Sequence, residues 1–453
     1  MRTLIKHVLR RDTPGDDLHV AGWVRTRRDS KTFSFLELND GTCLANLQVV
    51  ADAGIPGAAD LARMTTGASV EVRGRLVPSP ASGQQWELQA SSLRLLGCAP
   101  DDYPLQKKGH STEFLRGIAH LRPRTNLYGA VFRTRSRMAY AIHRFFQERD
   151  FIYVHTPIIT ASDCEGAGEM FRVTTLPADK AARDAEDFFG KRAFLTVSGQ
   201  LEGEAFACAL SNIYTFGPTF RAENSNTSRH AAEFWMIEPE VAFCDLESDM
   251  DLAESMVRFL VTEMLEHHEG DLEVFAKFVD KELRARLEFV AGRPFERIPY
   301  TEAVRLVQGS GVKFEYPCEY GLNLQSEHER WLTEVHFKQP VTVFNYPKEI
   351  KPFYMRLNDD GRTVTAMDVL VPGIGEIIGG SQREERLDVL LANFEHHGLD
   401  AANYGWYADL RKYGSVPHAG FGLGFERLLM FVTGMGNIRD VIPFARTPGH
   451  CEF

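Results

Sequence analysis

The chain lacks the cysteine patterns that mark metal sites and disulfide frameworks. It has seven cysteines, an odd number, and none of them forms a CxxC pair. We therefore expect reduced thiols and no structural zinc. The sequence also lacks an apolar run of about 18 residues, the length that would span a bilayer. Its first residues, MRTLIKHVLRRDTPGDD, contain no apolar signal-peptide segment. We expect no membrane span and a cytoplasmic protein.

Positive charge is in deficit, because the net charge of the 453 residues is −11. This sign argues against a protein that coats nucleic acid indiscriminately. A local basic patch exists at Arg25, Arg27, Arg28 and Lys31. An acidic body with one basic patch suits selective, salt-sensitive binding of a single RNA. The composition, 44% hydrophobic and 25% charged, is that of a globular protein with two or three domains.

Residues 1 to about 100 predict a small barrel of the OB type. Five segments alternate apolar and polar residues, with a helical break near Ala58 to Met64. Arg25, Arg27, Arg28 and Phe33 are candidates for binding single-stranded nucleic acid by charge and stacking. For Phe33 a place in the barrel core is about equally plausible, and for Phe35 the core is favoured.

Residues 101–128 contain scattered Pro and Gly among charged residues and predict a linker. An amphipathic helix is expected from Tyr128 to about Arg149. The segment FIYVHTPIIT then predicts a strand that ends at Pro157.

The stretch from Tyr214 to Phe243 predicts a hairpin that carries unusual charge. Arg221 and Glu223 are two residues apart, so on a strand they would share one face. Arg229 and His230 follow in the loop, and the return strand carries Glu233, Phe234, Glu238 and Glu240. Arginines neutralise phosphate, carboxylates bind amino groups and an aromatic ring stacks on a base. These residues suit a site for a nucleotide and a zwitterion, although a solvated hairpin is the simpler alternative.

Two further blocks combine glycines with charge. MDVLVPGIGEIIGGSQRE, from Met367 to Glu384, places Glu376 and Asp368 near Gly379, where a carboxylate can hold a metal against a phosphate. GFGLGFERLLMFVTG, from Gly420 to Gly434, joins a glycine-rich strand to a helix with Arg427.

These blocks together resemble the class II aminoacyl-tRNA synthetases, in their asparaginyl and aspartyl branch. The resemblance places motif 1 at about 130–157, motif 2 at about 214–243 and motif 3 at about 420–434. It implies an α+β fold with three parts. An OB-fold anticodon-binding domain would occupy residues 1–100, a hinge residues 101–128, and an antiparallel catalytic sheet flanked by helices residues 129–453. It also implies a homodimer.

The resemblance implies a role for each candidate residue. Arg221, Glu376 and Arg427 would be catalytic. ATP would bind to Arg221, Glu223, Arg229, His230, Phe234, Glu376, Gly424 and Arg427. The amino acid would bind to Glu165, Gln200, Arg221, Glu233, Gly379 and Arg383. Mg²⁺ would bind to Glu376 and Asp368, and the anticodon to Arg25, Arg27, Arg28 and Phe33.

Position 203 separates the two members of the branch. Aspartyl enzymes resemble this region with a lysine that neutralises the substrate carboxylate, whereas this chain has Gly203. Aspartate opposite Arg383 alone would leave buried charge under-compensated. A carboxamide needs a donor and an acceptor, which Arg383 and Glu233 would supply.

We therefore expect activation of L-asparagine with ATP and its transfer to tRNA(Asn), releasing AMP and pyrophosphate. The alternatives are an aspartyl-tRNA synthetase, including a non-discriminating one, a tRNA-independent amide synthetase and a non-catalytic RNA-binding paralogue. The presence of Arg221, Glu376 and Arg427 argues against the last of these.

Overall fold

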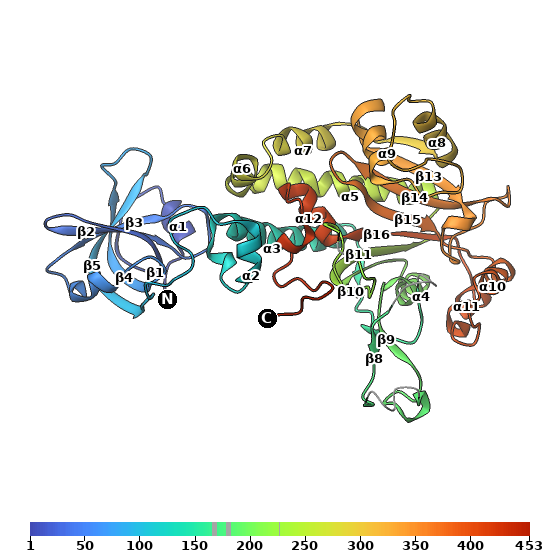
Figure 1. The fold of residues 1–453 in the computed structure, drawn as a ribbon, viewed down its shortest axis with the longest axis horizontal. Coiled ribbons are helices and arrows are strands. Elements are labelled where there is room, and N and C mark those ends of the chain that lie inside the picture. The colour runs from blue at the N-terminus through green and yellow to red at the C-terminus, as the bar shows by residue number, and fades with distance from the viewer. Residues whose placement is uncertain (165–169, 178–182, 226) are drawn as a thin grey trace. The chain divides into compact units, whose positions relative to one another are not determined.

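A computed structural model of the protein describes residues 1–164, 170–177, 183–225 and 227–453. The chain divides into two compact units, Met1–Thr134 and Arg135–Phe453. Each unit carries its own layer of strands (Figure 1). The functional boundaries that we infer at residues 100 and 128 stay a prediction.

The first unit is built on a closed five-stranded barrel. Its strands follow the order β1-β2-β3-β5-β4, with β3 and β5 parallel and the other pairs antiparallel. Its elements are α1 (Ile5–Leu9), β1 (Gly15–Asp29), β2 (Phe33–Asn39), β3 (Leu47–Asp52), η1 (Ala58–Arg63), β4 (Ser69–Pro78), β5 (Trp86–Gly97), α2 (Thr112–Gly117), η2 (Arg122–Arg124) and the start of α3 (Asn126–Gln147). The predicted OB-type barrel is confirmed, with its helical break at η1.

Side-chain alternation along β2 corrects one expectation. Leu36 and Leu38 are fully buried in the barrel core. Phe33 is exposed, and Phe35 is half-buried beside it, with ring centroids 5.4 Å apart. Both phenylalanines lie on the opposite face from the leucines because successive strand residues alternate. The favoured core position for Phe35 was therefore wrong.

The second unit contains an eight-stranded sheet in the order β12-β13-β14-β15-β16-β11-β10-β6. The six central strands are antiparallel, and the edge strands β12 and β6 pair in parallel with β13 and β10. The strands are β6 (Ile152–Tyr153), β7 (Ile159–Thr160), β8 (Arg172–Val173), β9 (Ala193–Leu195), β10 (Asn212–Phe220), β11 (Glu233–Ala242), β12 (Glu296–Pro299), β13 (Val341–Pro347), β14 (Thr363–Val371), β15 (Gly375–Gln382) and β16 (His418–Gly424). Strands β7, β9 and β8 form a separate small sheet. The predicted strand to Pro157 is shorter than expected, because β6 ends at Tyr153.

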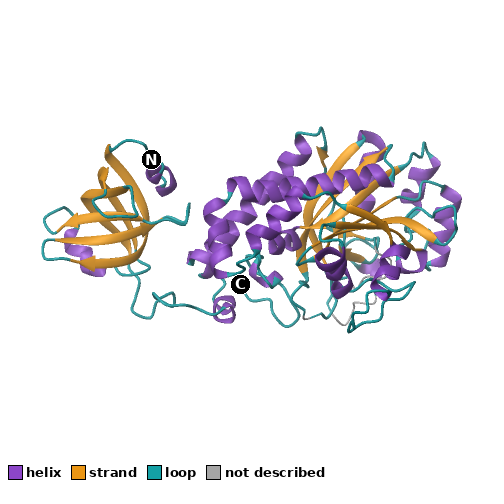
Figure 2. Cartoon of the chain, turned by 90° about the horizontal axis from the view of Figure 1, so that it is seen from above, coloured by secondary structure: helices purple, strands orange, loops and turns teal. Residues whose placement is uncertain are grey.

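Helices flank this sheet (Figure 2). The helices of this unit are α4 (Gln200–Leu210), α5 (Leu246–His267), α6 (Glu269–Phe278), α7 (Leu283–Gly292), α8 (Tyr300–Gln308), α9 (Ser326–Arg330), α10 (Leu387–His396), α11 (Gly405–Lys412) and α12 (Phe425–Thr433), with short turns η4 (Asp184–Glu186), η5 (Trp331–His336), η6 (Lys348–Ile350) and η7 (Ile438–Asp440). Helix α5 packs across β14, β15 and β16, while α4 packs against β10 and β11. The α+β architecture expected from the sequence is confirmed.

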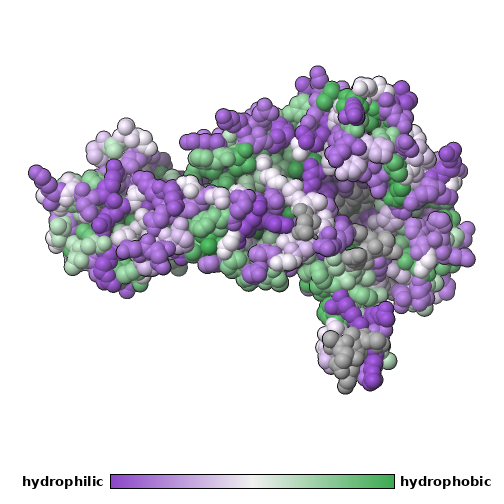
Figure 3. All heavy atoms as spheres, in the orientation of Figure 1, coloured by the Kyte–Doolittle hydropathy of each residue, from purple (hydrophilic) through white to green (hydrophobic). Residues whose placement is uncertain are grey.

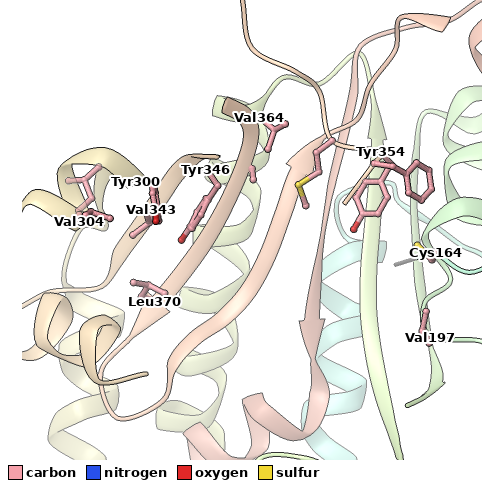
Figure 4. Close-up of a cluster of buried hydrophobic side chains, with 14 of the residues drawn as sticks. Cys164, Val197, Tyr300, Val304, Val343, Tyr346, Tyr354, Val364 and Leu370 are labelled. Carbon is pink, nitrogen blue, oxygen red and sulfur yellow. The ribbon is translucent and has the colours of Figure 1, made fainter. Parts of the chain in front are cut away.

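A large apolar cluster fixes the β12–β14 end of the sheet. Tyr300 of α8 and Tyr346 of β13 are buried there, with ring centroids 4.9 Å apart (Figure 4). The same cluster extends through Tyr354 to Cys164 and Val197. Burial of such rings is the main stabilising contribution to a core of this kind.

The exterior carries mixed side chains. Hydrophilic and hydrophobic residues are interspersed over the face seen in Figure 3. Among the described residues, none of the helices has the length and apolar character needed to cross a bilayer.

Candidate active site

A first cavity lies where the β10–β11 hairpin faces β15 and the start of α12. Its lining includes all eight residues that the resemblance assigns to ATP: Arg221, Glu223, Arg229, His230, Phe234, Glu376, Gly424 and Arg427. The predicted placement of Arg221 and Glu223 on the first strand was wrong, because β10 ends at Phe220. Both residues lie at the start of the loop, on the wall of the cavity.

Positive charge is concentrated in this first cavity. Burial, followed by repulsion from Arg427, lowers the pKa of the Arg229 guanidinium below its usual range. Arg221 lies over the ring of Phe234, with its guanidinium carbon 5.4 Å from the ring centroid. Arg427 donates from Nη1 to the backbone oxygen of Glu376 at 3.0 Å and lies 3.5 Å from its carboxylate. Such a set of cations beside an aromatic ring suits a nucleotide with several phosphates.

Glu426 joins the three sequence motifs to one another. This buried carboxylate accepts a hydrogen bond from the backbone N–H of Trp235 in β11 at 2.9 Å. It also pairs with Arg135 of α3 at 2.7 Å. The neighbouring Arg427, one position along α12, is thereby held at the cavity. Glu426 itself also lines the first cavity.

A second cavity adjoins the first and shares Arg221 and Glu376 with it. Gln200, Asp368, Gly379 and Arg383 also line it, as the resemblance implies for the amino-acid site. Glu165, the candidate for the substrate amino group, lies outside the described residues. Its neighbour Cys164 is on the cavity wall.

The structure does not bring Glu233 to the second cavity. Glu233 is exposed at the start of β11. Phe234 and Glu240 alternate with it and face the two cavities. The carboxylate beside Arg383 is therefore that of Glu240, and the sequence-based choice of Glu233 is corrected.

Glu240 and Arg383 form a fully buried pair. Arg383 donates through Nε to Glu240 Oε2 at 3.1 Å and through Nη2 to Oε1. Its remaining nitrogen, Nη1, donates to Ser381 Oγ at 2.9 Å. Burial raises the pKa of Glu240, and Arg383 opposes this rise.

A second buried carboxylate, Glu204 of α4, supports this pair from below. It accepts hydrogen bonds from Tyr407 at 2.8 Å, from Arg411 at 2.7 Å and from His418 at 2.9 Å. It also accepts one from Gln200 at 3.0 Å. Burial alone would raise the pKa of Glu204, but Arg411 and His418 lower it below its ordinary value. The charges are mutually compensated, as burial requires.

Two carboxylates of the β14–β15 hairpin flank Gly379. Asp368 is directly opposite Gly379 in the sheet register. A Cβ atom at position 379 would lie 3.3 Å from Glu376 Oε1 and 3.5 Å from Asp368 Oδ1. The absence of a side chain therefore leaves a cradle between the two carboxylates. Lys351 Nζ lies 3.2 and 3.1 Å from the two oxygens of Asp368.

Magnesium fits this cradle in one specific way. Mg²⁺ is usually held by one or two carboxylates together with substrate phosphates and water. The described residues provide no cluster of three or more side chains that would hold a metal alone. Asp368 and Glu376 provide two carboxylates next to the first cavity. The donor set therefore suits a metal that arrives with a nucleotide.

The barrel unit carries a separate groove. Arg28, Phe33 and Phe35 line it together with Gln48 and Glu87. Arg25 and Arg27 are not in its lining. Their guanidinium groups instead donate to the backbone oxygens of Arg124 and Leu61. Of the four basic and aromatic candidates, the structure brings only Arg28 and Phe33 to the groove.

Comparison with known families decides the assignment. Residues 112–448 match the model of class II tRNA synthetases (D, K and N), and residues 18–96 match that of the OB-fold nucleic acid binding domain. The chain belongs to the class II tRNA synthetases. Within that class it is similar to asparagine–tRNA ligases. Those of Oleidesulfovibrio alaskensis and Nitratidesulfovibrio vulgaris are 62% and 63% identical, and each match covers all of both chains.

Solved structures of class II synthetases agree with this grouping. Asparaginyl-tRNA synthetase of Pyrococcus horikoshii, complexed with asparaginyl-adenylate, matches with a TM-score of 0.88 at 32% identity, over 100% of this chain and 99% of that chain. The enzyme of Entamoeba histolytica, also with asparaginyl-adenylate, matches at 0.83 and 27% identity, over 97% of each chain.

Position 203 of this class II synthetase lies in α4, beside the side chain of Glu240. A Cβ atom at Gly203 would lie 3.4 Å from Ile213 and 3.6 Å from the Cγ of Glu240. A lysine here would extend toward Glu240 and compete with Arg383 for it. The lysine expected in an aspartyl enzyme is absent, and Glu240 is left to Arg383.

Lys351 and Glu204 of the synthetase site were missed in the sequence, and Glu240 was named among the hairpin carboxylates without a role of its own. The alternation of side chains along β11 contains the signal for Glu240, because Glu240 lies on the same face of the strand as Phe234. Lys351 and Glu204 carry no such signal. Their partners Asp368 and Arg411 are distant in sequence, so only the fold brings them together.

Proposed function

We propose that the chain activates L-asparagine with ATP and transfers it to the 3′ end of tRNA(Asn), releasing pyrophosphate and then AMP. The observation that carries this proposal is the position of Arg221 on the wall shared by the two cavities. One guanidinium there can contact both the α-phosphate of a nucleotide and the carboxylate of an amino acid.

The activation step needs positioning and charge neutralisation more than it needs a protein nucleophile. An oxygen of the asparagine carboxylate attacks the α-phosphorus, and pyrophosphate leaves on the opposite side. Arg221 neutralises the charge that develops around the α-phosphorus. Arg229 and Arg427 hold the departing phosphates, and Phe234 stacks on the adenine. In the second step the 3′ hydroxyl of the tRNA attacks the carbonyl carbon, and AMP leaves.

Magnesium is the metal we assign to Asp368 and Glu376. When bound, it would neutralise phosphate charge next to the cradle at Gly379. The two carboxylates would hold the metal near Arg427, which lies 3.5 Å from Glu376.

Asparagine is selected over aspartate by the buried pair at the end of the second cavity. Glu240 accepts a hydrogen bond from the carboxamide nitrogen, and Arg383 donates one to the carboxamide oxygen. An aspartate side chain would instead place a second carboxylate beside Glu240. With Gly203 supplying no added positive charge, such a placement costs several kcal/mol, as expected for buried like charges.

The barrel unit is the part we assign to the anticodon. Phe33 and Phe35 offer stacking faces, and Arg28 lies 5.9 Å from the ring centroid of Phe35. Gln48 donates to Glu87 at 3.2 Å on the same groove, so polar groups that can read base edges are present.

A homodimer is supported by exposed apolar residues around the first motif. Ile152, Tyr153, Ile158 and Ile159 are all exposed on or beside β6 and β7. Several exposed large apolar residues within one short segment are typical of a protein contact. We place the enzyme in the cytoplasm, where its tRNA substrate is found, and its seven cysteines, all among the described residues, are thiols outside any disulfide.

Pyrophosphate exchange tests the proposal. Purified protein with Mg²⁺ should exchange labelled pyrophosphate into ATP when L-asparagine is present, and far less when L-aspartate replaces it. Exchange that prefers aspartate would contradict the assigned specificity. Absence of exchange with either amino acid, with and without tRNA, would favour a non-catalytic RNA-binding role.

A further inference from the structure

A lysine ammonium lies against the metal cradle of the protein. Lys351 Nζ contacts both oxygens of Asp368, at 3.2 and 3.1 Å, and lies 4.0 Å from the ring centroid of Tyr346. Both side chains of the ion pair are largely buried, with exposed fractions of 14% and 16%. This contact therefore lies away from bulk water. The attraction between the two charges is stronger there than it would be in water.

The other carboxylate of the cradle is also paired with a cation. Arg427 lies 3.5 Å from Glu376 Oε2. Each of the two carboxylates thus has one basic partner of its own, and the two partners come from different elements. Both carboxylates therefore have a positive charge beside them before any metal arrives.

We propose that Lys351 is a resident counter-cation of the metal cradle, which keeps Asp368 from binding a divalent cation until a nucleotide is present. This inference rests on the proposed function, because it takes Asp368 and Glu376 as the magnesium ligands. It adds an order of binding that the ligand assignment alone does not contain.

The physical reason is competition between cations. A divalent ion that binds Asp368 alone must displace the ammonium or share the carboxylate with it, and like charges a few Å apart repel strongly in a buried site. A nucleotide changes this balance, because its phosphate oxygens supply negative charge to both cations. Lys351 lines the second cavity, so it can turn from Asp368 toward an anionic group there.

Manganese binding without nucleotide tests the role of Lys351 directly. Mn²⁺ is the probe, and the free ion is followed by electron paramagnetic resonance during titration of the full-length protein. Lys351→Met should bind Mn²⁺ at least tenfold more tightly than the unchanged protein when no nucleotide is present. With a non-hydrolysable ATP analogue, the difference between the two proteins should shrink.

Two further variants control for charge and for folding. Lys351→Arg keeps the positive charge and should bind Mn²⁺ as weakly as the unchanged protein. Lys348→Met removes a charge three residues away, where the Lys348 ammonium donates to the backbone oxygen of Gly361, and should leave Mn²⁺ binding unchanged. Because Lys351→Met leaves Asp368 buried without its cationic partner, the melting temperature of the variant should fall, and added Mn²⁺ should restore more of it than in the unchanged protein.

The outcomes separate the two assignments. If Asp368→Asn abolishes Mn²⁺ binding with nucleotide, but Lys351→Met binds no more tightly without it, the metal assignment stands and the counter-cation role is overturned. If Asp368→Asn leaves Mn²⁺ binding with nucleotide unchanged, the metal assignment itself fails, and the role of Lys351 fails with it.

Discussion

Glu240 accepts hydrogen bonds from two nitrogens of Arg383, and neither side chain is accessible to solvent. The guanidinium is therefore fixed in one orientation at the end of the second cavity. Its third nitrogen is held by Ser381. A pre-oriented donor beside a pre-oriented acceptor distinguishes a carboxamide from a carboxylate, because no side chain has to reorganise when the ligand binds.

Removal of the negative charge at position 240 should weaken asparagine binding specifically. Glu240→Gln removes one acceptor oxygen that serves Arg383 and the carboxamide of the ligand. The Arg383 guanidinium is then left with weaker hydrogen bonds. The expected cost is about 2–3 kcal/mol, or roughly 30- to 150-fold in the KM for asparagine. The KM for ATP should change little.

Glu233→Gln is the matched control for that experiment. It makes the same chemical change on the same strand, at the exposed residue on the opposite face. Pyrophosphate-exchange kinetics should stay close to those of the unchanged protein. A large rise in the asparagine KM for this variant, with none for Glu240→Gln, would restore the assignment made from the sequence.

Loss of the ring at position 234 should weaken nucleotide binding. Phe234→Ala removes the stacking face of the first cavity and the contact with Arg221. Stacking of one base contributes about 1–3 kcal/mol, so the KM for ATP should rise about 5- to 150-fold. Trp235→Ala alters the next residue, whose ring is exposed and absent from that cavity. Equal effects of the two variants would contradict a stacking role for Phe234.

The barrel groove should contribute to tRNA binding and leave activation unaffected. Phe33→Ala should raise the KM for tRNA(Asn) about tenfold or more, because one stacking face is lost. Its pyrophosphate exchange with asparagine should be unchanged. Phe114→Ala removes another exposed ring in the same unit, outside the groove, and is the control. Aminoacylation assays at varied tRNA concentration distinguish the two variants.

One buried thiol gives the fold an alkaline sensitivity. Burial, followed by the charge of Asp249, raises the pKa of Cys244 to about 12. An ordinary cysteine titrates at about 8.5. Between these values the unfolded chain releases a proton that the folded chain retains, so the free energy of unfolding falls as pH rises through this window.

Cys244→Ala should remove this contribution. The drop in melting temperature between pH 8 and pH 10, measured with reductant, should be smaller in the variant by an amount that corresponds to about 1–2 kcal/mol. Cys451→Ala changes an exposed cysteine and serves as the control. An identical drop in all three proteins would show that Cys244 does not titrate as proposed.

Sequence patterns were sufficient for the features that depend on neighbouring residues. The barrel strands, helix α3 and the β10–β11 hairpin follow from alternation and periodicity within one segment. The residues that line the first cavity come from short motifs, so the resemblance located them together. Glu233 and Glu240 lie on opposite faces of β11, and the sequence alone does not show which face lines the cavity.

The remaining features depend on tertiary packing. The direction of Arg25, toward the backbone oxygen of Arg124, follows from how the chain returns past the barrel. The ion pair between Lys351 and Asp368 joins the residue that follows η6 to strand β14. No local pattern encodes such contacts, because either side chain would be an ordinary surface charge in another fold.

The buried carboxylate of Glu204 also bears on synthesis of the chain. Its partners Tyr407, Arg411 and His418 lie 203, 207 and 214 residues further along. While a ribosome is still producing the segments between them, α4 has emerged without the cations that neutralise Glu204 once it is buried. A truncated or unfinished chain therefore cannot complete this part of the pocket. It stays a substrate for chaperones and proteases until the last few dozen residues appear.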